Sequence, residues 1–160
     1  MNDHGDSDGI HTAGALNGRA EALRLLGYTA QARAEFEKVL RLLERNKIGP
    51  KYGSFAEAIA GIGRVELDEG RPASAIPGLE SALRTFEQTS AANSVFVSDF
   101  RFALARALWD NGRDRPRAIS LAMQARDIFT RTGRADRVGE VASWLSSHQA
   151  RDMRKKTARH

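Results

Sequence analysis

Three glycine-marked turns recur at a nearly constant interval along this chain of 160 residues. They are Leu26-Gly27-Tyr28, Glu69-Gly70-Arg71 and Asn111-Gly112-Arg113, and their glycines are 43 and 42 residues apart. A fixed period of about 20–50 residues is typical of stacked supersecondary units, each of which buries its apolar face against its neighbours. The chain is therefore expected to fold as a row of similar helix pairs.

Apolar residues between these turns recur at three- and four-residue steps, which is the period of an α-helix. In the second stretch, for example, Val39 and Leu43 follow Phe36 at these steps, and polar residues occupy the other face. Strand signals are limited to residues 95–97, which have no alternating partner. The pattern predicts an all-α fold. The expected helices lie near residues 12–26, 29–46, 54–69, 72–89, 95–111, 115–131 and 135–148.

Small residues occupy equivalent positions when the three units are aligned on their glycines. The aligned sets are Ala20, Gly63 and Ala105 before the turn, Ala32, Ala75 and Ala118 after it, and Val39, Ala82 and Ala125 seven residues further on. Antiparallel helices pack closely only where no bulky side chain separates their axes. Together with the period, this pattern resembles the tetratricopeptide repeat in an extended form of about 42 residues.

The resemblance implies a right-handed α-solenoid of three helix pairs followed by a capping helix. These elements would cover residues 12–46, 54–89, 95–131 and 135–148. Residues 1–11 would form a flexible lead-in, and residues 149–160 a basic flexible tail. The segment 101–109 also looks like the repeat regions at the C-termini of bacterial serine/threonine kinases and signalling scaffolds. The implied role is a protein-interaction module in bacterial signalling.

In such solenoids the first helix of each pair lines a concave groove that binds a peptide or helix of a partner protein. The resemblance assigns to this groove Asn17, Arg24, Arg64, Leu67, Phe102, Arg106 and Trp109. Arg64 and Arg106 fall on equivalent positions, so stacking would place both along one wall. Their planar forks would suit the carboxylates of an acidic partner. The alternative is that both arginines are solvated or pair with neighbouring acids such as Glu57 and Asp99.

Val95, Phe102 and Trp109 recur every seventh residue and therefore share one helix face. Two interpretations are open at this stage. The three residues could pack against the capping helix, on Trp144, or Trp109 could be an exposed anchor for a partner, since tryptophan is enriched among binding hot spots.

Positive charge is concentrated in the last part of the chain. Residues 101–160 hold 14 basic and 6 acidic residues, a net charge of +8, whereas residues 1–100 have a net charge of −3. A nucleic acid or other polyanion could bind there, on Arg151, Arg154, Lys155, Lys156 and Arg159. This alternative is less favoured, because the segment lacks the interleaved aromatic residues of single-strand binders. Self-association is a further alternative, since no preceding helix covers the first one.

The sequence gives no signal for catalysis, a metal or a cofactor. It contains no cysteine, and no two of its four histidines are four residues apart, as a paired metal site on a helix requires. Gly61 and Gly63 lie inside a predicted helix, where they indicate close helix approach rather than phosphate binding. No signal peptide and no apolar run of about 18 residues is present. We therefore expect a non-enzymatic cytoplasmic protein that does not bind membranes.

Overall fold

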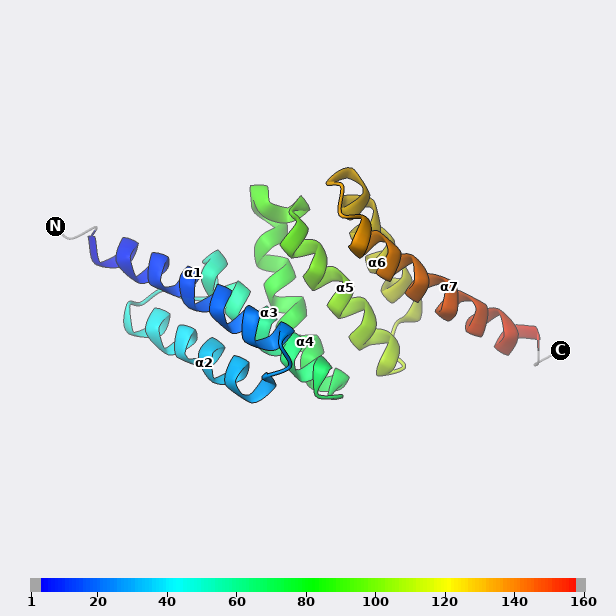
Figure 1. Ribbon diagram of the computed structural model, residues 1–160, viewed down its shortest axis with the longest axis horizontal. Helices are drawn as coiled ribbons and strands as arrows, with labels where there is room; N and C mark the ends of the chain where they lie inside the picture. Colours follow the sequence, from blue (N-terminus) through cyan, green and yellow to red (C-terminus); the bar gives the residue numbers. More distant parts are fainter. Residues whose placement is uncertain (1–3, 158–160) are drawn as a thin grey trace. The chain divides into compact units, whose positions relative to one another are not determined.

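The computed structural model describes the backbone of residues 4–157 and the side chains of residues 9–149. Within these residues every regular element is a helix, which confirms the predicted all-α class (Figure 1). The helices are α1 (His4–Leu25), α2 (Thr29–Arg45), α3 (Gly53–Asp68), α4 (Pro72–Glu87), the short 3₁₀ helix η1 (Ser90–Asn93), α5 (Val95–Asp110), α6 (Arg115–Arg131) and α7 (Ala135–Thr157).

The helices α2 to α6 begin and end within two residues of their predicted limits, but the two outermost helices are longer than expected. α1 begins at His4 rather than near residue 12, and α7 continues to Thr157 rather than ending near residue 148. The predicted lead-in of residues 1–11 and the tail of residues 149–160 thus both contain helix. Acidic residues near the start of α1 and basic residues near the end of α7 have the charges that the helix dipole favours there. Extending a helix that already exists also carries no nucleation cost.

The chain divides into two compact units, Met1–Ala92 and Asn93–His160. In the N-terminal unit α1 packs on α2, α2 on α3 and α3 on α4, and α1 also contacts α3. In the C-terminal unit α5 packs on α6, and α6 on α7. Figure 1 shows that α1 and α2 are antiparallel neighbours, as are α5 and α6. Each unit is therefore built from consecutive helical hairpins.

Glycines with positive φ follow four of the helices: the three periodic glycines come after the first helix of each pair, and a fourth comes after α6. They are Gly27 (φ +84°), Gly70 (+73°), Gly112 (+69°) and Gly133 (+71°). After Gly27, the Tyr28 amide donates to the Leu23 carbonyl oxygen at 2.9 Å, and bonds of the same type follow Gly70 and Gly112. This bond is typical of a helix that ends in a left-handed residue, where only glycine avoids a steric penalty. The periodic glycines of the sequence are thus the ends of first helices.

The nine aligned positions are all buried. They are Ala20, Ala32, Val39, Gly63, Ala75, Ala82, Ala105, Ala118 and Ala125. A Cβ added to Gly63 would lie 3.0 Å from the Leu79 side chain and 3.2 Å from the Ala75 carbonyl oxygen, both on α4. Gly63 therefore lies where the two helices of its pair approach closely, as predicted.

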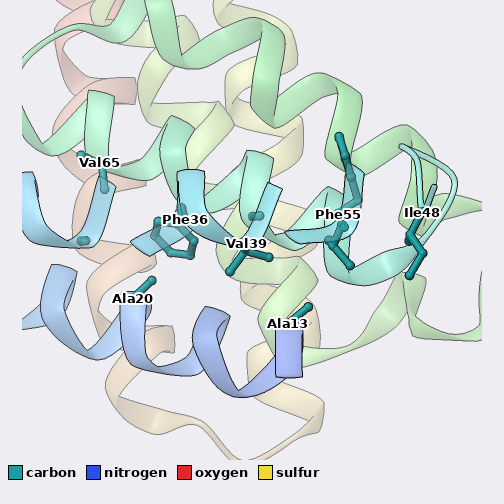
Figure 2. Close-up of a cluster of buried hydrophobic side chains, with 10 residues drawn as sticks. Ala13, Ala20, Phe36, Val39, Ile48, Phe55 and Val65 are labelled. Carbon is teal, nitrogen blue, oxygen red and sulfur yellow. The ribbon is translucent and has the colours of Figure 1, made fainter. Parts of the chain in front are cut away.

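The core of the N-terminal unit is centred on Phe36 of α2. Figure 2 shows Ala13 and Ala20 of α1 beside Phe36 and Val39, in a cluster that includes residues of α3. A Cβ at Gly61 would lie 2.3 Å from the Phe36 ring, so this glycine leaves the space that the ring fills. Gly61 is thus a helix-packing residue, as its sequence context predicted.

Candidate functional site

The seven predicted groove residues lie on α1, α3 and α5, and they differ in accessibility. Three of them, Asn17, Leu67 and Phe102, are buried. The side chains of Arg24 and Arg64 are only 10% and 14% exposed. The remaining two, Arg106 and Trp109, are partly exposed. A partner could therefore reach Arg106 and Trp109 directly, whereas the buried residues support the packing beneath the surface.

Asn17 holds α1 against the start of α3. Its amide nitrogen donates to the Ser54 carbonyl oxygen at 3.0 Å and to Glu57 Oε2 at 3.2 Å. Burial raises the pKa of Glu57, the hydrogen bond from Asn17 partly offsets this rise, and the nearby charge of Glu21 adds to it. Asn17 is thus a structural contact between two first helices.

An ion-pair network joins the C-terminal halves of the same two helices. Arg24 donates to both carboxylate oxygens of Glu21, at 2.9 and 3.0 Å, and to Asp68 Oδ2 at 2.5 Å. Arg64 Nη2 lies 2.9 Å from Glu21 Oε1. Burial alone would lower the pKa of Arg24, but its hydrogen bonds to Glu21 and Asp68 and their negative charges outweigh burial and raise it. A partner carboxylate that approaches Arg24 or Arg64 must therefore compete with Glu21 and Asp68.

The alternative that the arginines pair with neighbouring acids is confirmed for Arg64, although its partner is Glu21 rather than Glu57. Asp99 pairs with Arg137 of α7. Arg106 is half-buried, and no ion pair joins it to another described residue. Arg64 and Arg106 belong to different units, so their alignment along one wall stays a prediction.

An aromatic cluster forms the corresponding contact of the C-terminal unit, between α5 and α7. The Trp144 ring meets Phe102 edge-on at 5.8 Å between centroids and Trp109 at 5.7 Å. His148 stacks on Trp144 at 4.3 Å, one helical turn further along α7, and meets the edge of Trp109 at 4.8 Å. The prediction that Phe102 and Trp109 pack against the last helix, on Trp144, is thereby confirmed. Edge-on and stacked pairs are the geometries that aromatic quadrupoles favour.

Cations surround this aromatic cluster. The Arg115 guanidinium carbon lies 4.9 Å from the centre of the Trp109 ring. That of Arg137 lies 5.9 Å from the Phe102 ring, and Arg137 also donates to Asp99, at 3.0 Å from Nε. These distances are within the range of cation–π attraction. The partly exposed Trp109 is therefore held in place from two sides.

The predicted basic patch falls outside the described side chains. The structure describes only the backbone of α7 at Arg151, Arg154, Lys155 and Lys156. Arg159 lies outside the described residues.

Sequence reasoning missed the pairs that join one first helix to the next. Asn17 and Glu57 are 40 residues apart, Arg24 and Asp68 are 44 apart, and Asp99 and Arg137 are 38 apart. All of these separations are close to one repeat. A search for side chains about one period apart that are complementary in charge or in hydrogen bonding could have found them.

No protein-family model matches this sequence, and no curated protein matches it. In the part of the chain that the structure describes, no group of three or more histidine or acidic side chains is placed to hold a metal ion. The same residues include no helix with the length and apolar character needed to cross a membrane.

Proposed function

We propose that this chain is a protein-interaction module. In this proposal it is a right-handed, tetratricopeptide-like solenoid of three helix pairs and a C-terminal helix, and it binds a peptide or helix of a partner protein in a groove along its first helices. The sequence resemblance favours a role in bacterial signalling in the cytoplasm.

One observation carries the proposal: in both units, a first helix contacts the helix two places further along the chain. α1 meets α3 through Asn17 and the Glu21 network, and α5 meets α7 through Trp144. Contacts of this kind place first helices side by side. In a repeat array they leave one face of those helices available for a ligand.

The two partly exposed predicted residues, Arg106 and Trp109, are the best candidates for direct contact. They lie three residues apart on α5 and so share one face of that helix. Trp109 is held by Trp144, His148 and Arg115, so binding would require little ordering of its side chain.

Site-specific photo-crosslinking tests this proposal. A photoreactive phenylalanine analogue at position 106 is expected to crosslink a discrete partner in cells. The same analogue at Met123, an exposed residue of α6, serves as the matched control. Crosslinks that appear at position 106, are absent at position 123 and are lost in Trp109→Ala would support the proposal. Equal crosslinking at both positions would contradict it.

A second candidate function, self-association, is favoured by an apolar turn. Leu25, the last residue of α1, and Leu26, in the turn that follows, are 69% and 71% exposed, and Tyr28 in the same turn is also exposed. The equivalent residues at the end of α3 and in the turn before α4 are Asp68, Glu69 and Arg71. Exposed apolar patches on soluble proteins often mark interaction sites. A molar mass that rises with concentration in light scattering, and that falls to the monomer value in Leu25→Ser/Leu26→Ser, would support this candidate; a constant monomer mass would contradict it.

A further inference from the structure

An open surface cavity of about 550 Å³, lined mostly by exposed residues, lies between the loop that follows α2 and the C-terminal end of α4. The Thr85 hydroxyl donates to the Pro50 carbonyl oxygen at 3.1 Å and so ties the loop to the helix. Among the described residues the lining includes no carboxylate. It is formed by Pro50, Lys51, Ser81, Arg84, Thr85, Gln88 and Thr89.

Both cations of this cavity lack a carboxylate partner. No ion pair joins Lys51 or Arg84 to another residue of the described part of the chain. Other arginines of the same unit are paired: Arg33 Nη2, for example, lies 3.2 Å from Glu69 and 3.6 Å from Glu66. The cavity therefore holds two positive charges that form no ion pair with the described residues of the unit.

The helix dipole explains only part of this arrangement. Arg84 lies in the last turn of α4, where the partial negative charge of the helix end favours a cation. Lys51 is in the loop, so the dipole gives no reason for its position. The two full positive charges exceed the helix-end charge of about −0.5, so the residues that line the cavity carry a net positive charge.

We propose that this cavity binds an acidic segment of a partner protein. Ser81, Arg84 and Thr85 share one face of α4, since they are three and four residues apart, and the C-cap residue Gln88, seven residues after Ser81, continues this face. The distance from Ser81 to Gln88 is about 10 Å along the helix. An extended segment of about three residues has this length.

The carboxylates and the backbone of such a segment can each bind a residue of the cavity lining. The planar fork of Arg84 can donate two hydrogen bonds to one carboxylate, and Lys51 carries the charge for a second. The Gln88 amide can donate to a backbone carbonyl oxygen of the segment. The cavity lies on a second helix of a pair, so it is separate from the first-helix surface of the proposed function and is tested independently of it.

The test uses the full chain and a fluorescein-labelled hexapeptide of alternating aspartate and glutamate, with binding measured by fluorescence anisotropy. Lys51→Ala/Arg84→Ala is expected to weaken binding about tenfold, since each exposed ion pair contributes up to about 1 kcal/mol. Binding should also weaken as salt is added. Because both side chains are exposed, the variant should keep the circular dichroism spectrum of the wild type.

The matched control is Arg41→Ala/Arg45→Ala, which removes the same charge from α2. These arginines line a cavity of about 560 Å³ that also contains Glu44. The control should change the affinity by less than about twofold, and Lys51→Glu/Arg84→Glu should bind a lysine-rich peptide in place of the acidic one. Equal loss in both alanine variants, no binding at millimolar peptide, or tighter binding of a single-stranded oligonucleotide that also depends on Lys51 and Arg84 would each overturn the proposal.

Discussion

The contact between α1 and α3 and the contact between α5 and α7 occupy equivalent places in their two units, but they use different chemistry. The first consists of Asn17 and a network of ion pairs, whereas the second consists of stacked and edge-on aromatic rings. Asn17 and Phe102 both lie ten residues before their turn glycines, Gly27 and Gly112. The repeating backbone therefore decides which positions meet, and the side chains at those positions decide what kind of contact results.

This difference has an energetic consequence. Burying aromatic rings removes apolar surface from water and is little affected by salt. Ion pairs contribute less to the free energy of folding, because the cost of removing the two charges from water offsets most of their attraction. Both tryptophans of the chain, Trp109 and Trp144, belong to the C-terminal unit, so tryptophan fluorescence reports on that unit alone.

The largest effect is expected from removing the aromatic contact. Phe102→Ala should lower the free energy of unfolding of the C-terminal unit by about 3–5 kcal/mol, because it leaves a cavity beside Trp144. Urea unfolding followed by tryptophan fluorescence measures this loss. Met123→Ala, at an exposed site in the same unit, should change the stability by less than about 0.5 kcal/mol. A loss below about 1 kcal/mol in Phe102→Ala would show that Phe102 contributes little to the contact.

A smaller effect is expected at the equivalent polar position. Asn17→Ala should destabilise the N-terminal unit by about 1–3 kcal/mol, because the Ser54 carbonyl oxygen and Glu57 lose their common donor. Faster amide hydrogen exchange in α1 and α3 would reveal the loss. If exchange in these helices were unchanged, Asn17 would not hold them together.

The smallest effect is a gain in stability that depends on pH. Because the pKa of Glu57 is raised, the folded state binds this proton more tightly than the unfolded chain does. At neutral pH the charged carboxylate of Glu57 therefore lowers the free energy of unfolding. This loss of stability disappears as the pH falls through the raised pKa of the folded state and then through the ordinary pKa of the unfolded chain. Glu57→Gln keeps an acceptor for Asn17 and should be more stable at neutral pH by about 0.5 kcal/mol.

Denaturant unfolding of wild type and Glu57→Gln at neutral pH and at about pH 4 measures this difference, which should vanish at the lower pH. A variant that is less stable than the wild type at neutral pH would show that the charge of Glu57 is needed for the contact.

The sequence predicted the helices well because glycine turns and apolar periods are local signals. The outer limits of α1 and α7 were missed because residues 4–11 and 149–157 carry no apolar period. The packing of Phe102 and Trp109 on Trp144 could be predicted, since a spacing of seven residues places side chains on one helix face.

The partners of the groove residues could not be predicted in the same way. Asn17 was expected in an open groove because the resemblance assigned its first-helix position to that groove, yet it is buried and bonded to α3. Arg24 and Arg64 both form ion pairs with Glu21. These pairs depend on how α1 is aligned with α3, which follows it about one repeat later in the sequence. Local patterns do not contain that alignment.

The ring of Phe36 fills the space that a side chain at position 61 would need, and Gly61 has none. The sizes of the residues at these two positions therefore depend on each other. An added methyl group at position 61 would overlap the ring, and a smaller residue at position 36 would leave a void. Neither position can change size alone without loss of stability. Substitutions at positions 36 and 61 are thus expected to occur in compensating pairs, with a larger residue at one accompanied by a smaller residue at the other.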